Sequence, residues 1–125
     1  MAGERILIVD DNPTNLKLVA YLMRSRGYEV ETALDADAAL AAIARLPPRL
    51  ILMDLQLPGV DGLQLTRQLK SDPATRDIKI VAVTAYAMKG DQDKAFAAGC
   101  DDYITKPIDT RRLPDTVARH LERGP

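Results

Sequence analysis

The chain has 125 residues, a length that fits one domain able to fold without disulfide bonds or a structural metal. Its net charge of −1 argues against nucleic acid as the default partner. One cysteine and one histidine exclude an internal disulfide, a Cys-based metal site and a His-cluster zinc site. No apolar run approaches the roughly 20 residues of a membrane span. We therefore expect a globular protein in a reducing, cytoplasmic setting, with no nucleic-acid binding and no membrane insertion.

The first strand–helix unit is marked by an apolar run and by residues typical of helix ends. Residues 5–10 form an apolar run that ends in acid, which predicts a strand buried on both faces. Asn12 is expected to cap the following helix, with Pro13 in its first turn and Gly27 where it stops. Helical spacing predicts that the buried side of this helix consists of Leu16, Val19, Ala20 and Met23.

The second unit has a less apolar strand. Residues 28–33 alternate enough to predict a half-exposed strand. Asp35 is expected to cap the next helix, and the pair Pro47 and Pro48 to end it. The buried stripe predicted for this helix contains Leu40, Ile43 and Ala44.

The third and fourth units repeat the pattern of a buried strand with a polar end. Residues 50–54 are a second apolar run that closes with Asp54, and a Pro-Gly turn then leads into a helix with Leu65 and Leu69 on its buried side. Residues 78–83 predict a fourth strand, which ends at Thr84.

The fifth unit is shorter and contains an awkward proline. Asp91 is expected to cap a short helix that stops at Gly99, and residues 103–105 predict a brief strand. Because a proline inside a helix removes a hydrogen-bond donor, we expect the last helix to start near Pro114, with residues 109–112 in a looser turn. Its buried side is predicted to be Leu113, Val117 and Leu121.

Five strand–helix units in strict alternation predict an α/β fold in a single domain, residues 1–125, with a five-stranded parallel sheet covered by helices on both faces. Such sheets carry their sites outside the carboxyl ends of the strands. Polar side chains follow the strands there: Asp10, Asp11, Asp54, Thr84 and Lys106. We therefore expect these side chains to converge along one edge of the sheet.

This convergence predicts a site for a hard divalent cation. Three carboxylates and one ammonium leave two net negative charges, and the carboxylates would repel one another in a partly buried cleft. Mg²⁺ would relieve the repulsion, with Asp10, Asp11 and Asp54 nearby and the backbone carbonyl of Gln56 as a further oxygen ligand. Taken singly, an Asp after a strand is more often a helix cap or a turn former, but four strand ends that all supply such groups favour a site.

The same residues suit phosphoryl transfer. The Asp54 carboxylate can act as a nucleophile and become an acyl phosphate. The positive charge of Lys106 and the hydroxyl of Thr84, together with Mg²⁺, can neutralise the phosphoryl oxygens. An ionised carboxylate needs no general base, so the chemistry does not require His120.

Four segments carry a recognisable pattern: ILIVDDN, LILMDLQLPGVDG, VAVTAYAMKGD and YITKP. Together they resemble the CheY-like receiver domain of two-component response regulators, and the segment after the fourth strand is similar to stand-alone cell-cycle receivers and to receivers attached to hybrid kinases. The resemblance implies the flavodoxin-like strand order 2-1-3-4-5, Asp54 as the phosphoacceptor and a cis peptide bond before Pro107. The chain departs from the family pattern at Pro114, which argues against dimerisation through a regular last helix.

The resemblance also implies a switch and two partner surfaces. Thr84 would bond the phosphoryl group and Tyr103 would rotate inward, the alternative being a static, half-buried strand aromatic. A histidine kinase or histidine phosphotransfer protein would donate the phosphoryl group, docking through Thr14, Asn15, Leu18 and Pro107. A downstream protein would bind around Met88, Lys89 and Gln92. Leu18 lies off the buried helix stripe, although a stray surface leucine explains this equally well.

Other classes of protein are less consistent with these residues. A flavodoxin-type electron carrier needs a phosphate cradle where this chain has Asp10 and Asp11. An aspartyl-phosphate phosphatase needs an acid at the position where this chain has Gln56. The only catalysis expected of this chain is therefore transfer of a phosphoryl group onto its own Asp54 and hydrolysis from it. An unphosphorylated adaptor and a receiver fragment of a longer regulator or hybrid kinase stay as alternatives. Met1 and the helix-length C-terminus favour a complete chain.

Overall fold

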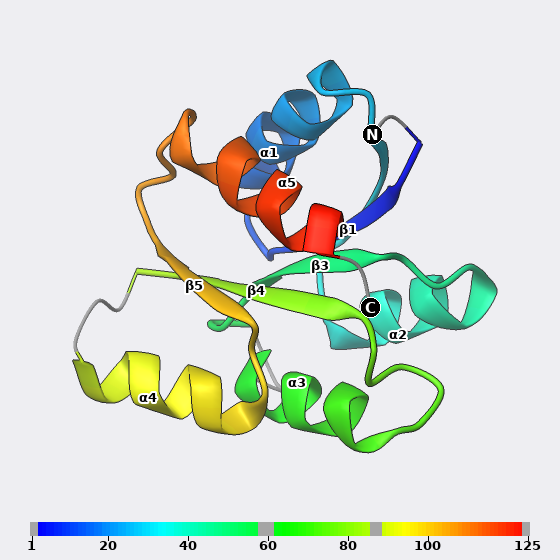
Figure 1. The fold of residues 1–125 in the computed structure, drawn as a ribbon, viewed down its shortest axis with the longest axis vertical. Coiled ribbons are helices and arrows are strands. Elements are labelled where there is room, and N and C mark those ends of the chain that lie inside the picture. Colours follow the sequence, from blue (N-terminus) through cyan, green and yellow to red (C-terminus); the bar gives the residue numbers. More distant parts are fainter. Residues whose placement is uncertain (1–2, 58–61, 86–88, 124–125) are drawn as a thin grey trace.

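The computed structural model describes residues 3–57, 62–85 and 89–123 (Figure 1). Strands and helices alternate along this described part of the chain. The strands are β1 Arg5–Val9, β2 Glu29–Ala33, β3 Leu50–Asp54, β4 Lys79–Thr84 and β5 Asp102–Thr105. The helices are α1 Pro13–Ser25, α2 Ala36–Arg45, α3 Gly62–Ser71, α4 Lys89–Ala98 and α5 Arg112–Arg123. The pairings are parallel and the order is β2-β1-β3-β4-β5, which confirms the predicted fold class.

Helices cover both faces of the sheet. Figure 1 shows α1 and α5 on one face and α2, α3 and α4 on the other. In β1, Ile6 and Ile8 pack in the core on the α1–α5 side, whereas Leu7 and Val9 pack in the core on the α2–α4 side. Successive side chains of a strand point to opposite faces, so an unbroken apolar run serves two cores at once.

The ends of the first two helices follow from their local sequence. The side-chain oxygen of Asn12 accepts the N–H of Thr14 at 2.9 Å, and Pro13 is the first residue of α1. Gly27 follows the helix with a φ of 88°, a conformation that side chains with a Cβ rarely adopt. Asp35 accepts the N–H of Ala38 at 2.8 Å at the start of α2. These predicted caps are confirmed.

Two helix predictions are wrong in detail. α4 begins at Lys89, so Asp91 lies in its first turn rather than at its cap. In α2, Ala44 is exposed and Leu40 only half-buried. Its buried face consists of Ala36, Ala39, Ala42 and Ile43. α2 therefore packs on the sheet mainly through small side chains, rotated from the stripe that the larger apolar residues suggested.

The last helix starts earlier than expected. α5 begins at Arg112, and the Asp109 carboxylate accepts the N–H groups of Arg111 at 2.9 Å and Arg112 at 3.1 Å. Pro114 falls within the first helical turn, where a missing N–H breaks no intrahelical hydrogen bond. The residues predicted for the buried side of α5 are buried: Leu113, Val117 and Leu121. No helix in the described ranges is long and apolar enough to span a bilayer.

Candidate functional site

Three aspartates meet at the carboxyl ends of the two central strands. Asp10 directly follows β1 and Asp54 is the last residue of β3, and these strands are hydrogen-bonded neighbours. One carboxylate oxygen from each of Asp10, Asp11 and Asp54 lies within 4.8 Å of the others. Asp10 and Asp54 are buried, with exposed fractions of 5% and 2%, whereas Asp11 is exposed. The predicted convergence of these three side chains is confirmed.

Lys106 partly compensates the negative charge of this cluster. Its Nζ lies 3.3 Å from Oδ2 of Asp10 and 3.3 Å from Oδ2 of Asp54. The backbone fixes its position, since the N–H of Lys106 donates to the carbonyl of Thr84 at 2.7 Å and so extends the β4–β5 ladder. One ammonium for three carboxylates leaves two net negative charges.

Hydrogen bonds leave one oxygen of each buried carboxylate directed at the shared cluster. Oδ1 of Asp10 accepts the N–H of Asn12 at 2.9 Å, and Oδ1 of Asp54 accepts the N–H of Gln56 at 3.0 Å. Burial raises the pKa of Asp54 and the charge of Asp10 raises it further, whereas the Gln56 N–H and Lys106 act in the opposite direction. The net shift is upward, so a further positive charge here would be stabilising.

This donor set fits Mg²⁺. Hard divalent cations prefer carboxylate and carbonyl oxygens, and the cluster offers three carboxylates with unneutralised charge. The fit rests on the donor chemistry, and the upward pKa shift of Asp54, caused mainly by burial with a further contribution from the charge of Asp10, agrees with it.

Thr84 and Gln56 lie beside the acidic cluster. Thr84 is fully buried at the end of β4, the strand next to β3, and Val83 is in register with Asp54. The side-chain oxygen of Gln56 accepts the N–H of Ala85 at 3.3 Å and thereby ties the loop after β3 to the end of β4. This contact was not predicted, because a lone glutamine after a strand gives no signal for a cross-strand hydrogen bond.

Tyr103 occupies an inward position. Its exposed fraction is 5%, and it belongs to the core on the α2–α4 side together with Ala95 of α4. Burial raises the pKa of its phenol, and the nearby charge of Asp91 raises it further. The side chain is therefore buried, not half-buried as the static alternative assumed.

The residues predicted to bind the phosphodonor lie at the same edge as the aspartates. Thr14 and Leu18 are exposed on α1, with 41% of Leu18 accessible, and Asn15 is half-buried beside them. Pro107 is exposed, and its bond to Lys106 is cis, as the resemblance implied.

The other predicted surface is only partly described. Gln92 is exposed on α4. Met88 lies outside the described residues, and Lys89 is described only as the first residue of α4.

Comparison with known proteins agrees with this geometry. A model of the response regulator receiver domain matches residues 6–118. The polar-differentiation response regulator DivK of Brucella anthropi is 43% identical over 116 residues, which cover 93% of this chain and 94% of DivK. DivK of Brucella abortus matches with the same identity and coverage.

Solved structures give the same result. A putative response regulator from Chloroflexus aurantiacus has a TM-score of 0.92 and 32% identity, covering 96% of this chain and 98% of that one. The receiver domain of a sensor histidine kinase from Pseudomonas aeruginosa, determined with magnesium in its active site cleft, has a TM-score of 0.87 and 36% identity, covering 97% and 99%. The chain therefore belongs to the response regulator receiver domain family and acts in phosphorylation-dependent signalling.

Proposed function

We propose that Asp54 accepts a phosphoryl group from a phosphohistidine on a histidine kinase or a histidine phosphotransfer protein. The observation that supports this proposal is the pairing of the buried Asp54 carboxylate with Asp10, Asp11 and the Lys106 ammonium at one sheet edge. In the reaction, a carboxylate oxygen of Asp54 forms a bond to phosphorus while the phosphorus–nitrogen bond of the donor breaks. The electron pair of that bond stays on the departing imidazole nitrogen.

The surrounding residues would stabilise charge on the transferred group. Lys106 is placed to neutralise one phosphoryl oxygen, and Thr84 to donate its hydroxyl to another. Asp10, Asp11, Asp54 and the Gln56 carbonyl would hold Mg²⁺, which when bound supplies Lewis-acid stabilisation of the phosphoryl oxygens. The nucleophile carries no proton when ionised, so no general base is required. The only catalysis proposed is transfer onto, and hydrolysis from, Asp54 itself.

Phosphorylation would change the surface that a partner recognises. We assign phosphodonor docking to Thr14, Asn15, Leu18 and Pro107, which share the exposed rim beside the aspartates. Thr84 and Tyr103 would couple the new phosphoryl charge to a downstream protein that binds around α4, at Met88, Lys89 and Gln92. A cytoplasmic location stays part of the proposal, because the phosphodonor acts there.

The acceptor can be tested directly by intact-protein mass spectrometry. The full chain is incubated with acetyl phosphate and Mg²⁺, and wild type is expected to gain the mass of one phosphoryl group. Asp54→Asn is expected to gain none, because an amide is a poor nucleophile. Asp77→Asn, an exposed aspartate before β4, serves as the matched control and should be modified like wild type. Modification of Asp54→Asn, or none in wild type, would contradict the proposal.

A second measurement follows the proposed switch. The ring resonances of Tyr103 are expected to shift when wild type is phosphorylated, because its inward packing would respond to the charge on Asp54. Asp54→Asn treated in the same way should show no shift. A wild-type protein that is phosphorylated with an unchanged Tyr103 ring would rule out this residue as the switch.

A further inference from the structure

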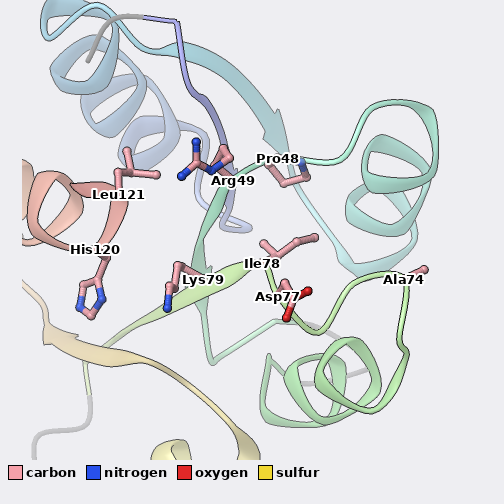
Figure 2. Close-up of a pocket in the computed structure, with 8 residues that line it drawn as sticks. All are labelled: Pro48, Arg49, Ala74, Asp77, Ile78, Lys79, His120 and Leu121. Atoms are coloured by element: carbon pink, nitrogen blue, oxygen red, sulfur yellow. The ribbon is translucent and has the colours of Figure 1, made fainter. Parts of the chain in front are cut away.

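A pocket of about 170 Å³ lies at the opposite edge of the sheet from Asp54. Arg49, directly before β3, and Lys79, the first residue of β4, line it together with His120 and Leu121 of α5 (Figure 2). Arg49 and Asp54 are separated by the length of β3, about 16 Å at the usual rise of a strand. The pocket is therefore distinct from the acidic site.

Two positive side chains line this pocket without a counter-charge. In the part of the chain that the structure describes, neither the Arg49 guanidinium nor the Lys79 ammonium has an ion-pair partner. Their backbones are adjacent, because the N–H of Lys79 donates to the carbonyl of Arg49 at 3.1 Å, and both side chains line the pocket (Figure 2). Asp77 also lines the pocket, but it is exposed and pairs with neither cation. The charged lining is thus net positive.

The remaining walls are apolar and held in place. Pro48, Ile78 and Leu121 are buried and line the pocket. His120 is 9% exposed, and its Nε2 lies 2.8 Å from Oδ2 of Asp102, so the α5 side of the pocket is fixed to β5. A pocket whose walls are already ordered loses little entropy when a ligand binds.

We propose that this pocket binds a small organic phosphomonoester, with its phosphate between Arg49 and Lys79 and its apolar part against Pro48, Ile78 and Leu121. The planar guanidinium of Arg49 matches two phosphate oxygens, and a dianion balances the two unpaired cations. The volume limits the organic part, since a cavity of about 150 Å³ holds a group the size of benzene. The site is independent of phosphorylation at Asp54.

Phenyl phosphate is a suitable probe because it combines a dianion with one aromatic ring. The full chain is titrated by NMR in the presence of a chelator, so that no divalent cation can recruit phosphate to the aspartates. Two parallel ligands serve as controls: phenol, which lacks the charge, and inorganic phosphate, which lacks the ring. Saturable shifts are expected at the Arg49 and Lys79 amides and at the His120 ring, and phenyl phosphate should bind more tightly than either parallel ligand.

Charge-removing variants test the assignment of the two cations. Lys79→Gln and Arg49→Gln are each expected to weaken phenyl phosphate binding by about fivefold or more. Lys94→Gln removes an exposed positive charge from α4, outside the pocket lining, and should change binding by less than about twofold. Equal losses in all three variants would show nonspecific charge attraction, equal binding of phenol would show an apolar pocket only, and unsaturable shifts would show no site. Each of these results would overturn the proposal.

Discussion

At the carboxyl edge of the sheet Asp10 and Asp54 are buried close to each other, whereas at the amino edge the like charges of Arg49 and Lys79 line one pocket near the surface. Arg49 is exposed and Lys79 is half-buried, so water reaches both cations, and no ion pair forms on either within the described residues. The buried acids lose most of that screening, and Lys106 lies between them at 3.3 Å from each. Repulsion between like charges is thus reduced by solvent at the amino edge and by the Lys106 counter-ion at the carboxyl edge.

The two edges also differ in how an aspartate titrates. Burial raises the pKa of Asp54, and its hydrogen bonds do not reverse that shift. Burial also acts to raise the pKa of Asp102 at the start of β5, but the hydrogen bonds from His120, the Tyr103 N–H and Arg119 lower it below its ordinary value. Desolvation decides the direction of the pKa shift at Asp54, and the hydrogen-bond donors decide it at Asp102. The neighbours of Asp102 therefore offset the cost of burying its charge, whereas the neighbours of Asp54 do not.

The largest effect on stability is expected from Lys106→Met. This change leaves the buried Asp10 and Asp54 without their shared counter-ion, and the free energy of unfolding at neutral pH should fall by about 2–3 kcal/mol. Added Mg²⁺ should recover part of the loss. The measurement is urea unfolding, and Lys79→Met at the amino edge is the matched control, with an expected change below about 0.5 kcal/mol. Similar losses in both variants would mean that the two edges do not differ in this way.

The second effect concerns the contact between α5 and β5. Asp102→Asn keeps an acceptor for the Tyr103 N–H but loses the charged bonds to His120 at 2.8 Å and Arg119 at 2.9 Å. The free energy of unfolding should fall by about 1 kcal/mol at neutral pH.

The pH dependence of this effect has a defined sign. Because the folded-state pKa of Asp102 is lowered, its contribution is present above the ordinary aspartate pKa and is lost as the pH falls through the folded-state value. The difference between wild type and Asp102→Asn should therefore shrink below about pH 4. A difference that stays constant down to about pH 2 would contradict the assigned role of the carboxylate charge.

Patterns that repeat along the chain predicted the fold and the acidic cluster. The apolar runs of β1 and β3 end in acid, and parallel strands bring their carboxyl ends together, so the meeting of Asp10, Asp54 and Lys106 follows from topology alone. The roles of these residues in phosphoryl transfer stay predictions. Leu18 was predicted to be exposed from its place off the helix stripe, and this is confirmed.

Features set by tertiary packing could not be predicted from sequence. α4 has several residues able to cap a helix, so local preference did not identify Lys89 as its first residue. His120 looked dispensable to the chemistry, and nothing in the sequence pairs it with Asp102, because that contact depends on how α5 packs across β5. The cationic pocket could not be predicted either, because Arg49 and Lys79 are 30 positions apart in the sequence and come together only through the pairing of β3 with β4.

The smallest effect, and the one of opposite sign, is expected from Asp54→Asn. The amide removes a buried charge that repels Asp10, keeps an acceptor for the Gln56 N–H, and leaves Lys106 paired with Asp10. Without divalent cations the variant should be more stable than wild type by about 0.5–1 kcal/mol at neutral pH. Urea unfolding in a chelator measures the difference, and Asp77→Asn at the other edge should show none.

Acid and magnesium should each remove this advantage of Asp54→Asn. Because the folded-state pKa of Asp54 is raised, the folded wild type takes up its proton before the unfolded chain does, so its stability gains as the pH falls through the raised value. At neutral pH, Mg²⁺ should stabilise wild type more than the variant, since a cation that binds only the folded state shifts the unfolding equilibrium. If Mg²⁺ stabilised both proteins equally, Asp54 would not belong to the metal-binding set.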